Sequence, residues 1–148
     1  MRGASDHYSE FGYYIHRVVA LIDRQGDAMF RRELGLGLAQ FNLLRFLEAS
    51  PEVPSQQQLA DRLGIAKSAV SRQIDIARRS GWIDVAVSES SRRQHTLTLT
   101  PTGRELLGRA KTLIEDSEIT GFGDLPEADA EATVRTLKAL HEKLTAQP

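Results

Sequence analysis

A run of hydroxyl and basic side chains between residues 67 and 79 is the part of this sequence with the clearest chemistry. The apolar residues Val70, Ile74 and Ala77 have the spacing of one face of a helix. At about 100° per residue, the opposite face carries Ser68, Ser71, Arg72, Asp75 and Arg79. An arginine can donate two hydrogen bonds to guanine O6 and N7, and a serine hydroxyl can reach a base or a phosphate. This face is therefore a candidate reader of duplex DNA.

Three further basic residues are placed to bind the DNA backbone. Lys67 stands at the start of the same helix, where unpaired backbone N–H groups already favour phosphate. Arg92 and Arg93 fall in a polar loop, residues 88–94, between strand-like segments at 82–87 and 95–100. We expect this basic hairpin tip to enter the minor groove or to contact its phosphates.

Other chemistries find little support in the sequence. The chain has no cysteine, so disulfides, thiolate metal sites and thiol redox switches are excluded. The four histidines lack local ligand spacing such as H-x3-H, and no metal site is expected. We find no glycine-rich phosphate loop, nucleophile elbow or clustered acid–base set, and the acidic run near residue 116 is typical of a solvated helix face. The sequence predicts neither an enzyme nor a cofactor.

The charge of the chain is unevenly distributed although its net value is only −1. Residues 62–93 carry seven basic and three acidic side chains, a net charge of +4, whereas residues 113–148 carry three and eight, a net charge of −5. A local basic segment on a nearly neutral chain can bind phosphates without making the whole protein adhesive.

The elements that must position these side chains follow from hydrophobic period and from cap residues. We predict a mainly α fold with a small β-hairpin wing, as one domain over residues 1–148. Ser55 and Gln58 form a capping box, Gly64 ends the short helix they open, and Thr100 caps a later helix that begins with Pro101. The predicted order is a long helix at about 5–34, a helix that stops before Ser50, the short helix, the helix at 67–80, the hairpin, and two helices within 101–147.

In order and spacing, several segments together resemble the MarR family of bacterial regulators. The resemblance spans nearly the whole chain and rests on residues 40–44 (QFNLL), 58–72 (QLADRLGIAKSAVSR), 81–83 (GWI), 92–93 (RR) and 99–103 (LTPTG). It implies a winged helix-turn-helix domain at about 38–100, flanked by dimerisation helices at about 5–34 and 101–147.

The resemblance also implies a function and site residues. It implies a homodimeric transcription regulator, expected to be a repressor, that binds a pseudo-palindromic operator in double-stranded DNA. By the family pattern, the major groove is contacted by Ser68, Ser71 and Arg72, the backbone by Lys67, Ser55 and Gln56, and the minor groove by Arg92 and Arg93. Many relatives release DNA when a small-molecule effector binds between the dimer helices and the winged domain. Position alone makes Tyr13, His16, Arg17 and Arg45 candidates for such a pocket.

Two residues depart from the family pattern. Ala66 stands where a serine or threonine usually caps the recognition helix, and losing that cap costs about 0.5–2 kcal/mol. Ser91 replaces the aspartate that usually precedes the paired wing arginines, so the arginines are expected to be held less rigidly.

The sequence also allows a different class of function. A winged fold can also serve as a protein–protein interaction module without DNA binding, in which case loss of Arg72 would have no effect on DNA. No apolar run approaches the roughly 18–20 residues that span a membrane, and residues 1–6 lead into no apolar leader core. We therefore expect a cytoplasmic protein with no membrane partner.

Overall fold

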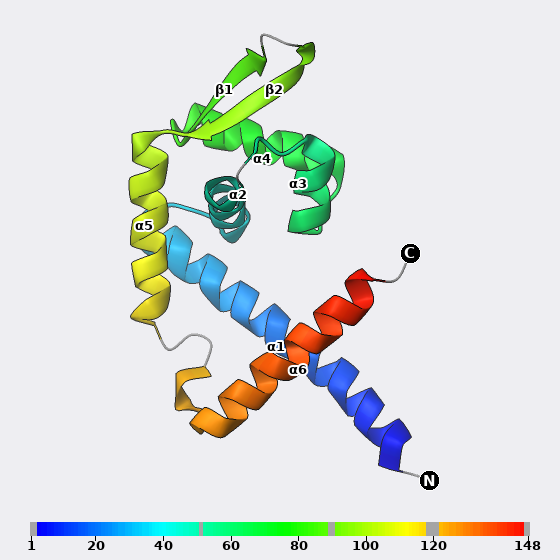
Figure 1. Cartoon of the computed structure of the whole chain (residues 1–148). Helices are drawn as coiled ribbons and strands as arrows, with labels where there is room; N and C mark the ends of the chain where they lie inside the picture. Colours follow the sequence, from blue (N-terminus) through cyan, green and yellow to red (C-terminus); the bar gives the residue numbers. More distant parts are fainter. Residues whose placement is uncertain (1–2, 51, 89–90, 118–121, 147–148) are drawn as a thin grey trace.

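The computed structural model describes residues 3–50, 52–88, 91–117 and 122–146, and at residues 3–5, 88, 91–95 and 122 it describes the backbone alone. The element order is α1 (Gly3–Leu34), α2 (Leu38–Ala49), α3 (Gln56–Leu63), α4 (Lys67–Arg79), β1 (Ile83–Ser88), β2 (Ser91–Leu99), α5 (Pro101–Glu115), a short 3-10 turn (Phe122–Asp124) and α6 (Glu127–Thr145). The hairpin lies at one end of the molecule together with α2, α3 and α4, and α1 and α6 extend away from that end (Figure 1). The predicted mainly α fold with a hairpin wing is confirmed.

The corner between α1 and α2 is fixed by backbone and side-chain hydrogen bonds. Gly35 adopts φ +65°, which permits its N–H to bond Arg31 O and the next N–H, of Leu36, to bond Phe30 O. Asp27 joins the two helices, because one carboxylate oxygen accepts from Arg31 Nε at 2.7 Å and the other from the Leu38 N–H at 2.9 Å. The Asp27 side chain therefore satisfies a free N–H at the start of α2 from a position on α1.

The core lies where α2 meets the end of α1, the helix-turn-helix, the wing and α5. Helix α2 contributes most, with Phe41, Leu43, Leu44 and Leu47 buried, and the Phe30 ring of α1 packs 4.8 Å from the Phe41 ring. The other buried apolar side chains include Leu36, Leu59, Val70, Ala77, Ile83, Leu97, Leu99, Leu106, Leu107 and Ala110. This single core holds α4 and the wing in a fixed relation to α2 and α5.

The start of α5 is tied to the turn that follows α4. Thr100 caps α5 by accepting from the Gly103 N–H at 3.0 Å, and its hydroxyl donates to Gly81 O at 2.6 Å. The Thr100 N–H donates to Trp82 O at 3.0 Å. Gly103 lies so close to this turn that a Cβ built on it would stand 2.0 Å from Trp82 O. The predicted cap and the proline at the first helical position are both present.

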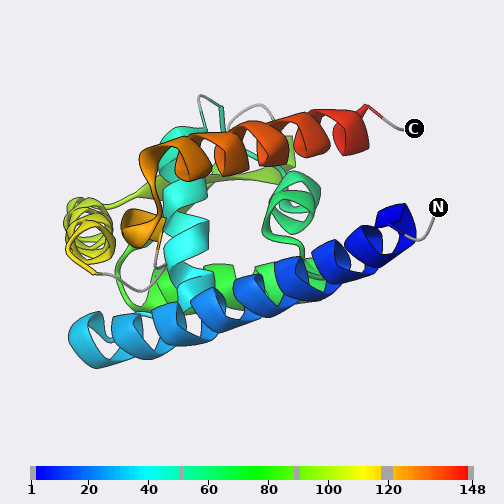
Figure 2. The same cartoon turned by 90° about the horizontal axis from the view of Figure 1, so that it is seen from below.

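Helix α6 contrasts with the rest of the molecule, because none of the residues Glu127–Thr145 is buried. The view from below shows α6 and α1 on opposite sides of the molecule along much of their lengths (Figure 2). Phe11 of α1 shares a shallow hollow with Thr133 and Leu137 of α6. Among the residues that the structure describes, no helix is long and apolar enough to cross a membrane.

Candidate nucleic-acid interface

The helix-turn-helix is built by local features that the sequence displays. Ser55 Oγ accepts from the Gln58 N–H at 3.1 Å while the Gln58 side chain accepts from the Ser55 N–H at 2.8 Å, so the predicted capping box is confirmed. Gly64 ends α3 in the left-handed conformation at φ +64°. Ala66 caps α4 without any side-chain hydrogen bond, as its residue type dictates. These features turn the chain sharply from α3 into α4.

Helix α4 presents the predicted polar face to solvent. Val70 and Ala77 are fully buried and Ile74 is half-buried, which anchors one side of the helix in the core. The side chains of Ser68, Ser71 and Arg72 are exposed on the other side, near the N-terminal end of the helix. A recognition helix contacts base edges with this part of its length.

A groove of about 780 Å³ runs between the start of α3, the middle of α4 and the wing. It brings together residues predicted to contact the DNA backbone, since Ser55, Gln56 and Lys67 all line it. The remaining lining residues are Val53, Pro54, Gln57, Gln58, Ile74, Asp75, Arg78, Val85, Thr96 and Leu97. At 3.5 Å, Ser71 Oγ and Gln56 Oε1 form a long contact that joins α4 to α3.

Arg78 is a charged residue of this groove that the sequence prediction did not include. Its place could have been derived from helical period, because Lys67, Ile74 and Arg78 recur at intervals of seven and four residues and so share a face. The prediction treated Arg79 as the outward arginine instead. Arg79 is exposed but does not line the groove.

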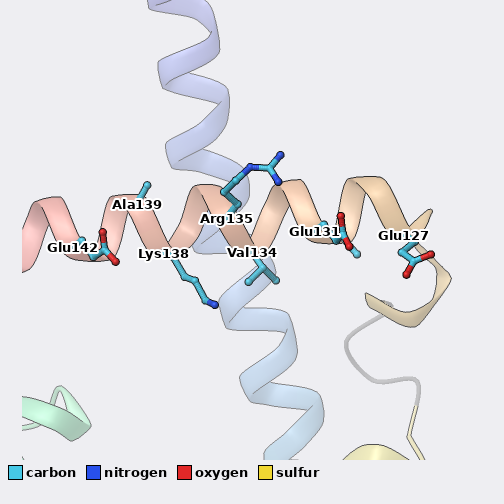
Figure 3. A pocket seen from close by; sticks show the side chains of 8 residues that line it. Glu127, Glu131, Val134, Arg135, Lys138, Ala139 and Glu142 are labelled. Carbon is cyan, nitrogen blue, oxygen red and sulfur yellow. The ribbon is translucent and has the colours of Figure 1, made fainter.

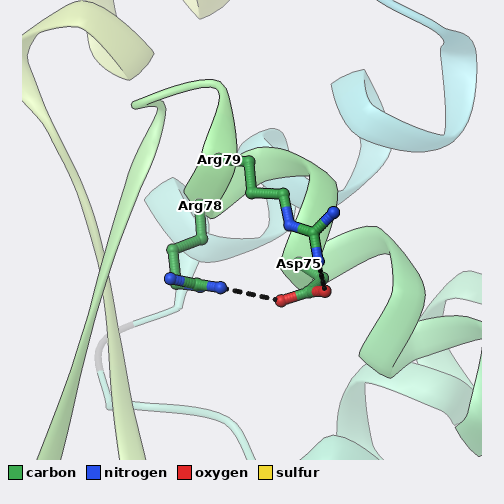
Figure 4. Close-up of polar contacts among 3 residues, drawn as sticks. All are labelled: Asp75, Arg78 and Arg79. Carbon is green, nitrogen blue, oxygen red and sulfur yellow. Dashed lines mark hydrogen bonds and ion pairs between the residues drawn. The ribbon is translucent and has the colours of Figure 1, made fainter.

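Asp75 holds both of these arginines. Its Oδ1 accepts from Arg78 Nη2 at 3.1 Å and its Oδ2 from Arg79 Nη2 at 3.0 Å (Figure 4). All three side chains are about half exposed or more, so solvent screens the ion pairs.

One buried polar side chain of α2 also contacts α4. Gln40 is 5% exposed, and its Nε2 donates to the backbone oxygen of Gln73 at 3.1 Å and to the Gln73 side-chain oxygen. Within the described residues Gln40 Oε1 has no hydrogen-bond partner. The two bonds from Nε2 restrain the Gln40 amide and join α2 to α4, since Gln73 belongs to α4.

The wing differs from its prediction in the length of the loop. Strand β1 pairs antiparallel with β2 in the register Ile83↔Leu99 and Val85↔Leu97, with an irregularity between Val87 and Ser88. Strand β2 begins at Ser91, so the predicted loop at 88–94 is wrong, and Arg92 and Arg93 lie in the strand next to the turn. Beyond the pair Val87↔His95, the strands pair again at Ser88↔Ser91, outside the apolar alternation that marked the predicted strand. The arginine side chains lie outside what the structure describes, as do residues 89–90.

The candidate effector residues do not form one site within a single chain. Tyr13, His16 and Arg17 are exposed on α1, and the Tyr13 ring packs edge-on against Tyr14 at 5.1 Å. Arg45 of α2 lies 5.7 Å from the centre of the Phe41 ring. Phe41 packs on Phe30, which is about 25 Å along α1 from Tyr13 at 1.5 Å per residue. In the described residues no group of three or more potential ligands could hold a metal ion.

A helix-turn-helix whose second helix presents a polar face beside a β-hairpin defines a winged helix DNA-binding domain. Known proteins agree with this class. The model of the MarR family matches residues 34–94. The HTH-type transcriptional repressor Rv2887 of Mycobacterium tuberculosis (strain H37Rv) is 31% identical over 107 residues, which cover 72% of this chain and 76% of the repressor. The chain belongs to the MarR family, so the resemblance noted in its motifs is confirmed.

Two solved structures of this family cover most of the chain. The crystal structure of Rv2887 with salicylic acid has a TM-score of 0.71 at 29% identity, covering 87% of this chain and 94% of the other. The repressor CouR bound to a 23-mer DNA duplex has a TM-score of 0.74 at 27% identity, covering 88% and 91%. These relatives are transcriptional regulators, and the prediction that the chain is not an enzyme is confirmed.

Proposed function

We propose that this regulator is a homodimeric repressor that binds a pseudo-palindromic operator and releases it on binding a small-molecule effector. The observation that carries the DNA-binding part is the exposed polar face of α4, with Arg72 near its start, beside a groove that collects Ser55, Gln56 and Lys67. The DNA-bound structure of CouR and the repressor Rv2887 support the same assignment.

In the proposed complex, α4 enters the major groove. Ser68, Ser71 and Arg72 reach base edges, with Arg72 suited to guanine. Lys67, Ser55 and Gln56 contact the phosphates that border the groove. Arg92 and Arg93 extend with the wing toward the minor groove, where narrow A·T-rich segments attract arginine.

The dimer is proposed from α6 and the N-terminal part of α1, which leave apolar side chains exposed in a single chain. On α1 the exposed apolar side chains are Tyr8, Phe11, Tyr13, Tyr14, Val18 and Val19, and on α6 they are Val134, Leu137 and Leu144. The hollow along α6 combines Val134 and Ala139 with the charged side chains of Glu131 and Lys138 (Figure 3). A 19-residue amphipathic helix that buries nothing gains little from its own chain, and a second copy supplies the missing contacts.

The effector part of the proposal has its support in relatives. Rv2887 has been crystallised with salicylic acid and with p-aminosalicylic acid, and CouR from Rhodococcus jostii RHA1 with p-coumaroyl-CoA. Tyr13, His16 and Arg17 lie on the proposed dimer helix, so a second copy is needed to bring other elements around them. We propose a cytoplasmic location because the operator is there.

DNA binding is tested by fluorescence anisotropy with an operator selected from random duplexes. Arg72→Ala is expected to lose roughly 5- to 150-fold in operator affinity, because a good arginine–guanine contact discriminates by about 1–3 kcal/mol. Arg109→Ala, an exposed arginine of α5, is the matched control and should bind as the wild type does. Binding that is equally weak for every duplex, or unaffected by Arg72→Ala, contradicts the DNA-binding assignment and favours an interaction module.

Dimerisation is tested by sedimentation equilibrium of Leu137→Asp. A carboxylate on the apolar stripe of α6 is expected to shift the protein toward monomer. Val87→Asp introduces the same charge at an exposed apolar position of β1 and should leave the association unchanged. A wild type that is monomeric at every concentration contradicts the proposed dimer.

A further inference from the structure

We infer that Asp75 is a specificity-determining residue, an intramolecular counter-ion that occupies Arg78 and Arg79 and suppresses sequence-independent binding to DNA. The inference rests on the DNA-binding function proposed above. It concerns how binding to non-specific DNA is weakened, whereas the proposed function concerns which side chains contact the operator.

The position of Asp75 is unusual for its charge. It is the only acidic residue in the sequence of α4, and it lines the groove together with Lys67 and Arg78. A carboxylate in the C-terminal half of a helix gains nothing from the helix dipole, which favours cations there. Its two oxygens are each bonded to a different guanidinium, at 3.1 Å and 3.0 Å. Arg78 lines the groove and Arg79 does not, so a single carboxylate offsets half of the combined charge of these two arginines.

A DNA phosphate and Asp75 compete for the same donors. Phosphate oxygens bind guanidinium in the same two-pronged way as a carboxylate, so a phosphate at this end of α4 has to displace Asp75 or meet its negative charge. On an operator, base contacts near the start of the helix fix how α4 docks, so Arg78 and Arg79 stay paired with Asp75 and the cost is not incurred. On other sequences those contacts are missing and phosphates supply nearly all of the affinity, so the cost falls mainly on non-specific binding.

The size of the effect follows from the exposure of the pairs. Exposed ion pairs are weak, and removing the two together should tighten non-specific binding roughly 2- to 30-fold. Each arginine freed to neutralise a phosphate should also steepen the dependence of log K on log salt by about 0.9. A steeper slope would not follow if Asp75 served only to stabilise the helix through its pairs with residues three and four positions on.

The experiment compares Asp75→Asn with wild type by fluorescence anisotropy over a salt series. The full-length protein is titrated with the selected operator and with a scrambled duplex of the same length and composition. We expect tighter binding and a steeper slope on the scrambled duplex, a smaller change on the operator, and hence a lower specificity ratio. Asp61→Asn is the matched control, since Asp61 is an exposed acid of α3 that accepts from Gln57 Nε2 and contacts neither arginine.

A second pair of variants isolates the counter-ion role. In an Arg78→Gln/Arg79→Gln background, Asp75→Asn should leave the salt slope unchanged, because no arginine remains to be freed. An effect that persists there, an effect matched by Asp61→Asn, or equal tightening on both duplexes would overturn the inference while leaving the proposed function intact. A wild type that binds no duplex overturns both. Circular dichroism of each variant shows whether altered binding reflects altered folding.

Discussion

The contact between Gly103 and Trp82 gives the sharpest test of how the wing is attached to the helices. Gly103→Ala places a methyl group 2.0 Å from Trp82 O, far inside van der Waals contact, and the obstacle is backbone and cannot rotate away. The shift needed to relieve it strains the Thr100 bonds to Gly81 and Gly103. Overpacking of this kind costs about 1–3 kcal/mol. For a chain of this size, the melting temperature should fall by about 2–12 °C.

Gly108→Ala in the same helix is the matched control, and its expected effect has the opposite sign. A Cβ at Gly108 meets nothing within 4 Å, so alanine adds only its higher helix propensity, about 0.5–1 kcal/mol. The melting temperature should rise by about 1–4 °C. Both variants are melted at one protomer concentration, because association would make the midpoint concentration-dependent. If Gly103→Ala is as stable as Gly108→Ala, the close approach of α5 to the α4–β1 turn is refuted.

Three further predictions concern helix ends. Two hydrogen bonds lower the pKa of Asp27 in the folded state. The bond from Arg31 has the larger effect and the bond from the Leu38 N–H the smaller. The contribution of Asp27 to stability is therefore complete above the unfolded pKa of about 3.9 and is lost as the pH falls through the lower folded value. Urea unfolding should show Asp27→Asn destabilised at pH 7 and matching wild type in strong acid. Ala66→Ser should stabilise the protein by about 0.5–2 kcal/mol, because it supplies the missing cap of α4, and Ser55→Ala should destabilise it by a similar amount. Urea titrations at pH 7 measure both.

Each of these predictions has an outcome that contradicts it. Asp23→Asn, at an exposed position of α1, is the control for Asp27, and an equal loss of stability in both would show that the corner contact is unimportant. A neutral Ala66→Ser would mean that the new hydroxyl does not reach a free N–H at the start of α4. A neutral Ser55→Ala would mean that the capping box contributes nothing beyond solvent hydrogen bonds.

Much of the fold could be predicted because its determinants are local. Three predicted features depend on a few adjacent residues each, and all three are present: the capping box at Ser55, the end of α3 at Gly64, and the start of α5 at Thr100–Pro101. The inward stripe of α4 followed from helical period for the same reason. The hairpin was harder, because β2 begins at Ser91, which pairs with Ser88 across an irregularity that the side-chain pattern does not reveal.

The site was less predictable than the fold because it depends on contacts between elements. The groove forms only when the start of α3, the middle of α4 and the wing meet, and sequence spacing cannot place Val85 beside Lys67. The Gln40–Gln73 contact was missed for that reason, because it joins residues far apart in the chain. Arg78 was missed although the helical period of α4 could have placed it on the same face as Lys67. Tyr13 and Arg45 were grouped by family position, and one chain alone does not bring them together.

The hydrogen bonds of Asp27 at the corner between α1 and α2 make these two helices move together. Both ends of the turn are bonded to one carboxylate, so a tilt of α1 carries α2, and with it the winged body, as one piece. With 32 residues α1 is about 48 Å long, so each degree of rotation about its far end moves the corner by about 0.8 Å. Dimers of helix-turn-helix domains bind half-sites whose centres lie one helical turn of DNA, about 34–36 Å, or a multiple of it apart. In a dimer joined through α1, a rotation of a few degrees is therefore enough to put two recognition helices out of register with the duplex.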